Sequence, residues 1–173
     1  SIGLAWLELS TGRFLLTELE PSQLQDELAR ISPAECLIPE SATQDDNLQM
    51  RRAEQQPMIF TTRPDWCFAK EEAKRLLNEH FGTKTLEGFD IDDSPAITAA
   101  GALLDYVRET QRTALTHIVR LEPWRRSRHM IIDEATRRSL ELAQTLRDGR
   151  RDFTLLGVMD ETCSPMGSRL LAE

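Results

Sequence analysis

The chain has 173 residues, enough for one large domain or for one domain and part of another. Hydrophobic residues make up 40% and charged residues 29%, which is typical of a globular protein and argues against a disordered one. The net charge of −8 is uneven, because residues 1–120 hold 20 acidic and 12 basic side chains, whereas residues 121–173 hold nine of each. An acidic first part suits a protein partner, or no partner, better than DNA phosphates.

Cysteine and histidine patterns argue against disulfides and metal sites. The three cysteines are far apart and form no C-x-x-C pair, which favours free thiols in a cytoplasmic protein. The three histidines show no ligand spacing. No apolar run approaches the roughly 20 residues of a membrane-spanning helix, and no signal peptide is evident. Both ends look cut, so we expect a fragment of a longer protein.

Residues 1–111 alternate between strand-like and helix-like periodicity, as in an α/β fold. A turn at Ser10-Thr11-Gly12 predicts a hairpin. The expected strands cover residues 2–9, 13–17, 36–38 and 58–61, and the expected helices cover residues 21–31, 69–80 and 95–111. The strand–helix–strand order of residues 13–38 is a crossover, which favours a parallel strand pair. Gly101 indicates close packing of the last helix against a neighbour.

The pattern changes after a junction at residues 110–118. Two short strands are expected at residues 118–121 and 130–132, on either side of a basic loop. A helix is expected from its cap, Asp133, to about Leu146. A short helix at residues 153–159 and a last one beginning at Ser164-Pro165 complete the second part.

Two clusters of charge could carry chemistry. Residues 90–93, three aspartates around Ile91, could bind a metal ion, but they lack the glycine and glutamate of an EF-hand loop. The favoured interpretation is an acidic loop before a helix with Ser94 as its N-cap. The run Arg125, Arg126 and Arg128 could contact phosphate, although a solvated loop is the more frequent meaning of so short a run.

Sequence signatures of catalysis and nucleotide binding are missing. There is no G-x-x-x-x-G-K-[ST] phosphate loop, no G-x-G-x-x-G and no G-x-S-x-G elbow. The eight glycines form no phosphate-cradling cluster. We therefore expect no enzyme activity and no bound cofactor in this part of the protein.

Several motifs share one order and spacing with a known family. They are LSTGRF at residues 9–14, PAE at 33–35, residues 81–89, AAGALLDY at 99–106, ETQRTALTHI at 109–118, residues 132–142 and residues 165–171. Together they resemble the connector domain and the start of the core, or lever, domain of MutS, a family of bacterial DNA mismatch-recognition ATPases. One departure is Ser139, where family members usually have Asn.

The resemblance implies a fold and a division into domains. Residues 1–120 would form an α/β connector domain of the RNase H-like type, with a mixed sheet flanked by helices. Residues 121–173 would form the mainly α-helical start of the lever domain. The first strand of the connector would precede Ser1, which would leave an unpaired sheet edge.

The resemblance also implies a non-catalytic role. A connector links the mismatch-reading and ATPase domains and offers a surface to MutL. ATP and Mg would belong to the parent protein, which would bind mismatched DNA as a cytoplasmic homo-oligomer without a membrane segment. Partner contact would involve Lys74, Arg75 and Leu76 on the middle helix. The alternative is a solvated helix face with Leu76 turned to the core.

Two other functions remain open from the residues alone. An RNase H-like nuclease relic would need carboxylates that gather around metal ions, for which Glu8, Glu35 and Asp105 are the candidates. A direct DNA-binding module would use Arg125, Arg126 and Arg128.

Overall fold

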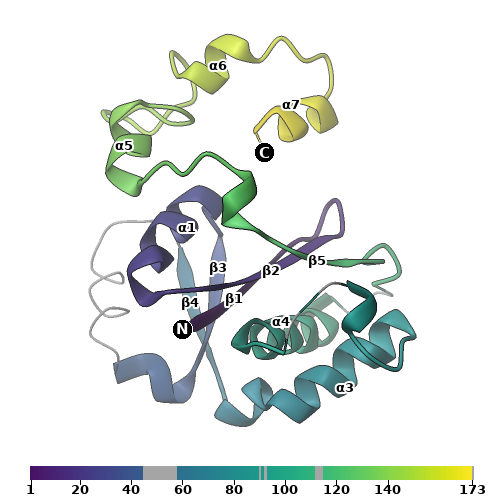
Figure 1. Ribbon diagram of the computed structural model, residues 1–173. Coiled ribbons are helices and arrows are strands. Elements are labelled where there is room, and N and C mark those ends of the chain that lie inside the picture. The colour runs from purple at the N-terminus through teal and green to yellow at the C-terminus, as the bar shows by residue number, and fades with distance from the viewer. Residues whose placement is uncertain (45–57, 90, 92, 112–114, 173) are drawn as a thin grey trace. The chain divides into compact units, whose positions relative to one another are not determined.

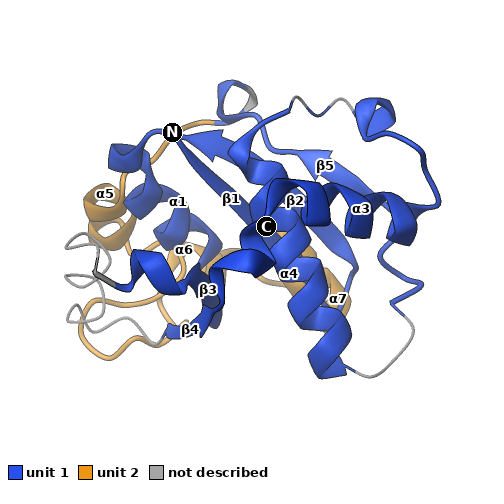
Figure 2. Ribbon diagram, turned by 90° about the horizontal axis from the view of Figure 1, so that it is seen from below, with its two compact units in different colours: residues 1–129 blue, residues 130–173 orange. Residues whose placement is uncertain are grey.

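Figure 1 shows a computed structural model of the chain, which describes residues 1–44, 58–89, 91, 93–111 and 115–172. The chain divides into two compact units, residues 1–129 and residues 130–173 (Figure 2). Each unit is described by itself below. The acidic run at residues 90–93 lies partly outside the described residues, since Asp90 and Asp92 are not among them.

A hairpin begins the first unit, as predicted. Strands β1 (Ile2–Glu8) and β2 (Arg13–Leu19) pair antiparallel, and Gly12 takes a φ of 75° in the turn between them. Such a positive φ suits glycine, which has no Cβ to clash with the backbone. The short strand β5 (Leu121–Pro123) joins the other edge of β2 in parallel, so the sheet has the order β1-β2-β5.

A second, two-stranded sheet holds β3 (Glu35–Pro39) and β4 (Ile59–Arg63), which pair in parallel. The prediction that the crossover through residues 13–38 makes a parallel pair of its two flanking strands is therefore wrong. The reason is that both edges of β2 are occupied, one by β1 and the other by β5. The parallel pairing arises instead between β3 and β4 and between β2 and β5.

Three helices complete the first unit: α1 (Leu24–Ile31), α3 (Lys70–Phe81) and α4 (Pro95–Gln111). Short 3-10 segments lie at Pro21–Gln23, Glu40–Gln44, Asp65–Phe68, Glu87–Phe89 and Arg126–Arg128. Helix α4 packs on β1 and β2, and α3 packs on α4. The core between them is almost entirely aliphatic, with Phe14, Leu77, Ile97, Leu104 and Leu121 among its fully buried members.

Two helix ends of this unit are capped, and the cap at Ser94 is the predicted one. Gly82 ends α3 with a φ of 64°, and the Ser94 hydroxyl accepts the backbone N–H of Ala96 at 3.3 Å at the start of α4. Gly3 of β1 lies so close to this start that a Cβ on it would be 2.2 Å from the carbonyl oxygen of Pro95. The lack of a side chain at residue 3 thus lets the first strand approach the start of α4.

The second unit contains three short helices, α5 (Glu134–Ser139), α6 (Leu155–Met159) and α7 (Pro165–Ala172). Asp133 caps α5 by accepting the backbone N–H of Thr136 at 2.8 Å, as predicted. The predicted extension of this helix to Leu146 is wrong. Glu141 adopts a left-handed φ of 47°, and so short a helix has little intrinsic stability once its apolar side chains stay exposed.

Of the two strands predicted after the junction, the one at residues 118–121 is shifted, since the observed β5 begins at Leu121, and the one at residues 130–132 does not form. Residues 118–120 form no strand, since Val119 is 75% exposed and the chain first meets β2 at Leu121. Residues 130–132 are also irregular, with Met130 and Ile131 exposed. An apolar run forms a strand only where a partner edge is available, and neither segment has one in this part of the chain.

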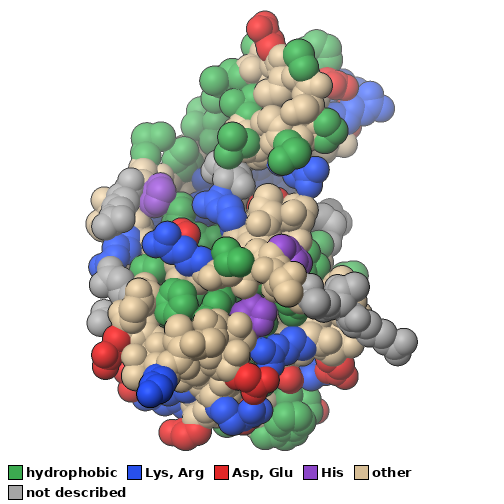
Figure 3. Space-filling view, turned by 90° about the vertical axis from the view of Figure 1, so that its right-hand side faces the viewer, with side chains coloured by type: hydrophobic (Ala, Val, Ile, Leu, Met, Phe, Trp, Pro, Cys, Tyr) green, Lys and Arg blue, Asp and Glu red, His purple; other side chains and the backbone are tan. Residues whose placement is uncertain are grey.

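The second unit has little interior of its own. Of its described residues only Thr154 is buried, whereas eleven large hydrophobic side chains are exposed. Figure 3 shows hydrophobic side chains gathered on the surface of this unit. Helices of this kind gain most of their stability from packing against further structure. The fold class nevertheless agrees with the prediction, an α/β unit with a mixed sheet followed by a helical segment.

Candidate partner surface

Helix α3 presents one face to the core and another to solvent. Ala73, Leu76 and Leu77 are buried, at the three- and four-residue spacing that places them on one side of a helix. Lys74 and Arg75 lie between them in sequence and are exposed at the side-chain level. Of the three residues predicted to contact a partner, Leu76 is 7% exposed and belongs to the interior. The exposed members of the predicted set are therefore Lys74 and Arg75.

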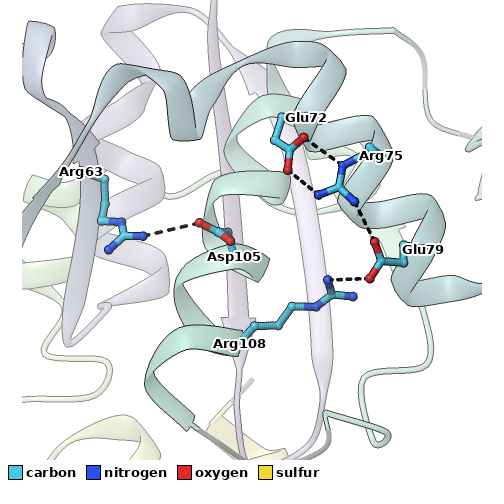
Figure 4. Close-up of polar contacts among 6 residues, drawn as sticks. All are labelled: Arg63, Glu72, Arg75, Glu79, Asp105 and Arg108. Carbon is cyan, nitrogen blue, oxygen red and sulfur yellow. Dashed lines mark hydrogen bonds and ion pairs between the residues drawn. The ribbon is translucent and has the colours of Figure 1, made fainter.

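Arg75 is held by two carboxylates of its own helix (Figure 4). Its Nε and Nη2 donate to the two carboxylate oxygens of Glu72 at 2.9 and 2.6 Å, and its Nη1 donates to Glu79 at 2.9 Å. The hydrogen bonds from Arg75 hold the pKa of Glu72 below its usual value. Arg108 of α4 reaches Glu79 at 3.5 Å and extends the network to the neighbouring helix. Exposed pairs of this kind add little stability, but they orient the side chains.

Lys74 is tied to the loop before α4. Its Nζ lies 2.9 Å from Oδ1 of Asp93, and Nζ of Lys70 lies 2.6 Å from Oδ2 of the same carboxylate. Hydrogen bonds from these two ammonium groups lower the pKa of Asp93, and the bond from Lys70 has the larger effect. Asp93, which the sequence placed in a possible metal loop, is therefore engaged by lysines here.

A second polar cluster lies on β3, β4 and α4. Tyr106 donates its hydroxyl to Glu35 at 2.8 Å, and Thr61 also donates to that carboxylate. Arg63 lies 2.7 Å from Glu109 and 3.5 Å from Asp105. Each carboxylate of this cluster is thus matched by a hydrogen-bond donor of the protein.

The carboxylates of the nuclease alternative do not form a metal site in this part of the chain. Glu35 and Asp105 are engaged as just described, and Glu8 accepts the hydroxyls of Ser10 and Thr11 in the hairpin turn at 3.0 and 2.9 Å. Among the described residues, no group of three or more His, Cys, Asp or Glu could hold a metal ion. The three cysteines in these residues are free.

The basic run after β5 is only partly available to phosphate. Arg126 donates to the carboxylate of Glu27 on α1, and its side chain is 17% exposed. Arg125 is exposed, and the side chain of Arg128 lies outside the described part of the chain. Sequence reasoning missed the contact between Glu27 and Arg126, because 99 residues separate them and no local pattern marks the pair.

Comparison with known proteins decides the family. The family described as MutS domain II matches residues 1–119, which is more than half of the chain, and the family described as MutS domain III matches residues 135–173. The chain belongs to the MutS family. The resemblance predicted from the motifs is confirmed: the chain comprises domain II, the RNase H-like connector, and the start of domain III, the core.

Two MutS relatives align along nearly the whole chain. The DNA mismatch repair protein MutS of Rhodopirellula baltica (strain DSM 10527 / NCIMB 13988 / SH1) is 44% identical over 174 residues, which is 99% of this chain and 19% of the relative. The protein of the same name from Salinibacter ruber (strain DSM 13855 / M31) is 36% identical over 171 residues, 98% of this chain and 18% of the relative. The chain therefore spans about a fifth of the length of these MutS proteins.

The end of the MutS domain II region lines a shallow cavity of about 590 Å³. It lies between the last turn of α3, Arg108 of α4 and residues 115–119, and Val119 forms part of its wall. His80 Nε2 lies 2.9 Å from the carbonyl oxygen of Ile118 and ties the end of α3 to this segment. No motif predicted the cavity, because residues 115–119 and the end of α3 come together only in the folded chain. In the part of the MutS chain that the structure describes, no helix has the length and apolar character needed to cross a membrane.

Proposed function

We propose that this chain is a non-catalytic connector and adaptor of a DNA mismatch repair protein. In this role it would link the mismatch-reading and ATPase parts of the parent and transmit nucleotide-dependent changes between them. The observation that carries the proposal is the order of matched families, domain II followed directly by domain III, within one chain. Both relatives are named DNA mismatch repair proteins.

The proposal includes a MutL-binding surface on α3. What supports it is that Lys74 and Arg75 are exposed cations whose positions are fixed by carboxylates that are themselves on the surface. A carboxylate of an acidic partner can replace Asp93, Glu72 or Glu79 as the ion-pair partner of Lys74 or Arg75. This replacement does not require the core to open, because all three carboxylates are exposed. Charge pairs at an interface rim govern encounter rate and specificity. Leu76 contributes by holding α3 in place.

Binding of the 173-residue chain to purified MutL tests the surface. Replacing Lys74 and Arg75 together by Glu is expected to weaken binding by about tenfold or more, since two attractive charges become repulsive. Lys84→Glu is the matched control, because Lys84 is exposed and lies outside α3. Circular dichroism should show equal helix content in all three proteins. Unchanged affinity of the folded double variant would remove Lys74 and Arg75 from the interface, and absence of binding by the unaltered chain would remove the surface altogether.

Further properties belong to the parent protein and are part of the same proposal. They are binding of mismatched DNA, ATP and Mg at a separate domain, assembly into a homo-oligomer, and a cytoplasmic location. We place the functional boundary after residue 120, with residues 1–120 as the connector and 121–173 as the start of the lever.

Phosphate contact by Arg125, Arg126 and Arg128 stays a prediction. A gel shift that weakens steeply with salt would support it, and the pairing of Arg126 with Glu27 argues for a small effect.

A further inference from the structure

Residues that follow β5 lie against the face of the sheet that is opposite to α4. Ala5 and Leu7 of β1 pack on the core that α4 covers, so Trp6, between them, points to the other face. Trp124 comes directly after β5 and continues its pairing, since its backbone N–H donates to the carbonyl of Leu16 at 2.7 Å. The two indoles meet edge to face, with ring centroids 5.9 Å apart.

Cationic and aromatic groups stack on Trp124. The guanidinium of Arg30, from α1, lies 4.0 Å from the Trp124 ring and 5.0 Å from the Trp6 ring. The imidazole of His129 stacks on Trp124 at 3.8 Å, with 9° between the rings. Arg30 and His129 must occupy opposite faces of the indole, because two groups at these distances cannot share one face. Trp124 is thereby enclosed between α1 and the end of its own segment.

A single carboxylate joins the segment to α1. Glu27 is 4% exposed, and its two oxygens accept from different arginines: Oε2 from Nε of Arg30 at 2.7 Å, and Oε1 from Nη1 of Arg126. Arg30 belongs to the same helix, whereas Arg126 comes from the segment after β5. A buried carboxylate requires such partners, since an unpaired charge in this place would be costly. Glu27 therefore favours the state in which residues 124–129 lie on α1.

We propose that residues 124–129 form a latch that closes on Glu27 and Trp6 and can open without unfolding of the first unit. Two observations make the latch separable from the core. The side chains of Trp124 and Arg126 contact α1, and Trp124 also contacts Trp6 on the outer face of β1, while the α3–α4 core lies on the other face. On opening, Glu27 keeps its bond to Arg30, so no buried charge is left without a partner.

The latch sets where the chain becomes free to move. With the latch closed, the chain is fixed to the first unit as far as His129, which also donates its backbone N–H to the carbonyl of Arg126 at 3.0 Å. The next residues, 130–132, have no regular structure and expose Met130 and Ile131. Opening of the latch would add residues 124–129 to this irregular segment and so lengthen it by six residues. The inference is independent of MutL binding, because it concerns a different face and different residues.

Amide hydrogen exchange of the whole chain, read residue by residue, tests the latch. Arg126→Ala removes one charge-assisted bond to Glu27, a loss that corresponds to about a tenfold rise in the population of the open state. Exchange at the amides of Trp124 and His129 should rise by that factor, while amides of Leu77 and Leu104 in the core should keep their rates. Arg108→Ala is the matched control, because it removes an arginine that pairs with Glu79 away from the latch.

Two outcomes would overturn the proposal. Unchanged exchange at Trp124 and His129 in Arg126→Ala would show that Glu27 does not hold the segment. An equal rise at Leu77 and Leu104 would show that the segment opens only with the core and is not a latch. Trp124→Leu provides a second variant that leaves the ion pair in place. It should produce the same local rise, because it removes the stack on Arg30 and His129.

Discussion

Gly101 of α4 faces Ala73 of α3 at a distance that leaves no room for a methyl group. A Cβ on Gly101 would lie 2.3 Å from the Cβ of Ala73 and 2.4 Å from its Cα. Both residues are buried, and the two helices pack on each other along this contact. The close crossing anticipated from a glycine in the middle of a helix is confirmed. The contact between Gly101 and Ala73 sets the distance between α3 and α4. It therefore sets the position of Lys74 and Arg75 relative to α4.

We expect Gly101→Ala to destabilise the first unit although alanine is the better helix former. The gain in helix propensity is about 1 kcal/mol, whereas overpacking costs about 1 to 3 kcal/mol. The cost should lie at the upper end, because the obstructing atoms are backbone and Cβ atoms that cannot turn away. A net loss of about 1 to 2 kcal/mol in the free energy of unfolding should appear in urea denaturation.

Gly88→Ala serves as the control for Gly101→Ala. A Cβ on Gly88 would meet nothing within 4 Å, so this substitution should leave the urea midpoint nearly unchanged. If Gly101→Ala were as stable as the unaltered chain, the two helices could separate at this point with little loss of packing energy. The close contact between α3 and α4 at Gly101 would then not determine the position of Lys74 and Arg75.

Local sequence patterns predicted the elements that carry strong periodicity and caps. Helix α4 has the predicted bounds, because a proline and a serine mark its start and its apolar face persists to residue 107. Helix α5 was predicted too long, since the left-handed turn at Glu141 has no glycine or asparagine to signal it. The contact of Glu27 with Arg126 and that of Glu35 with Tyr106 join residues 99 and 71 positions apart. Such pairs depend on tertiary structure, so the polar clusters could not be predicted.

Tyr106, the one tyrosine of the chain, should ionise at higher pH than a free phenol. Its hydroxyl donates to Glu35, and this bond, together with burial, raises its pKa. The folded state thus favours the protonated phenol. Stabilisation by this contact is fully present below the ordinary pKa of about 10 and is lost as the pH rises beyond it. An alkaline absorbance titration measures Tyr106 alone.

Glu35→Gln should move the Tyr106 titration to lower pH, because the amide removes the negative charge that opposes phenolate formation. Glu122→Gln is the control, since Glu122 pairs with Arg120 and has no contact with Tyr106 among those described. Identical titration curves for the unaltered chain and Glu35→Gln would mean that the Tyr106–Glu35 contact does not persist in solution.

Thr154 anchors the second unit, of whose described residues it is the buried one. Its hydroxyl donates to the carbonyl of Arg151 at 2.6 Å and accepts the backbone N–H of Gly157 at 3.0 Å, which caps α6. Thr154→Val keeps the shape and removes both bonds, so a loss of about 1 to 2 kcal/mol is expected. Thr154→Ser keeps the hydroxyl and should lose less. Exchange rates of the α6 amides report the difference, and equal rates in Val and Ser variants would contradict the cap.

Asp160 makes the second unit sensitive to acid. Its carboxylate accepts from the Ser168 hydroxyl at 2.6 Å, from the hydroxyl and backbone N–H of Thr162 at 2.6 and 3.1 Å, and from Arg151. These bonds lower the pKa of Asp160 to about 2, and the bond from Ser168 has the largest effect. Because the pKa is depressed, the stabilisation is present above the ordinary value of about 3.9 and is lost as the pH falls toward 2. Carboxyl NMR should show this midpoint. Ser168→Ala should raise it, and Ser127→Ala, in the first unit, should not. A midpoint near the ordinary value in the unaltered chain would show that the Asp160 contacts do not form in solution.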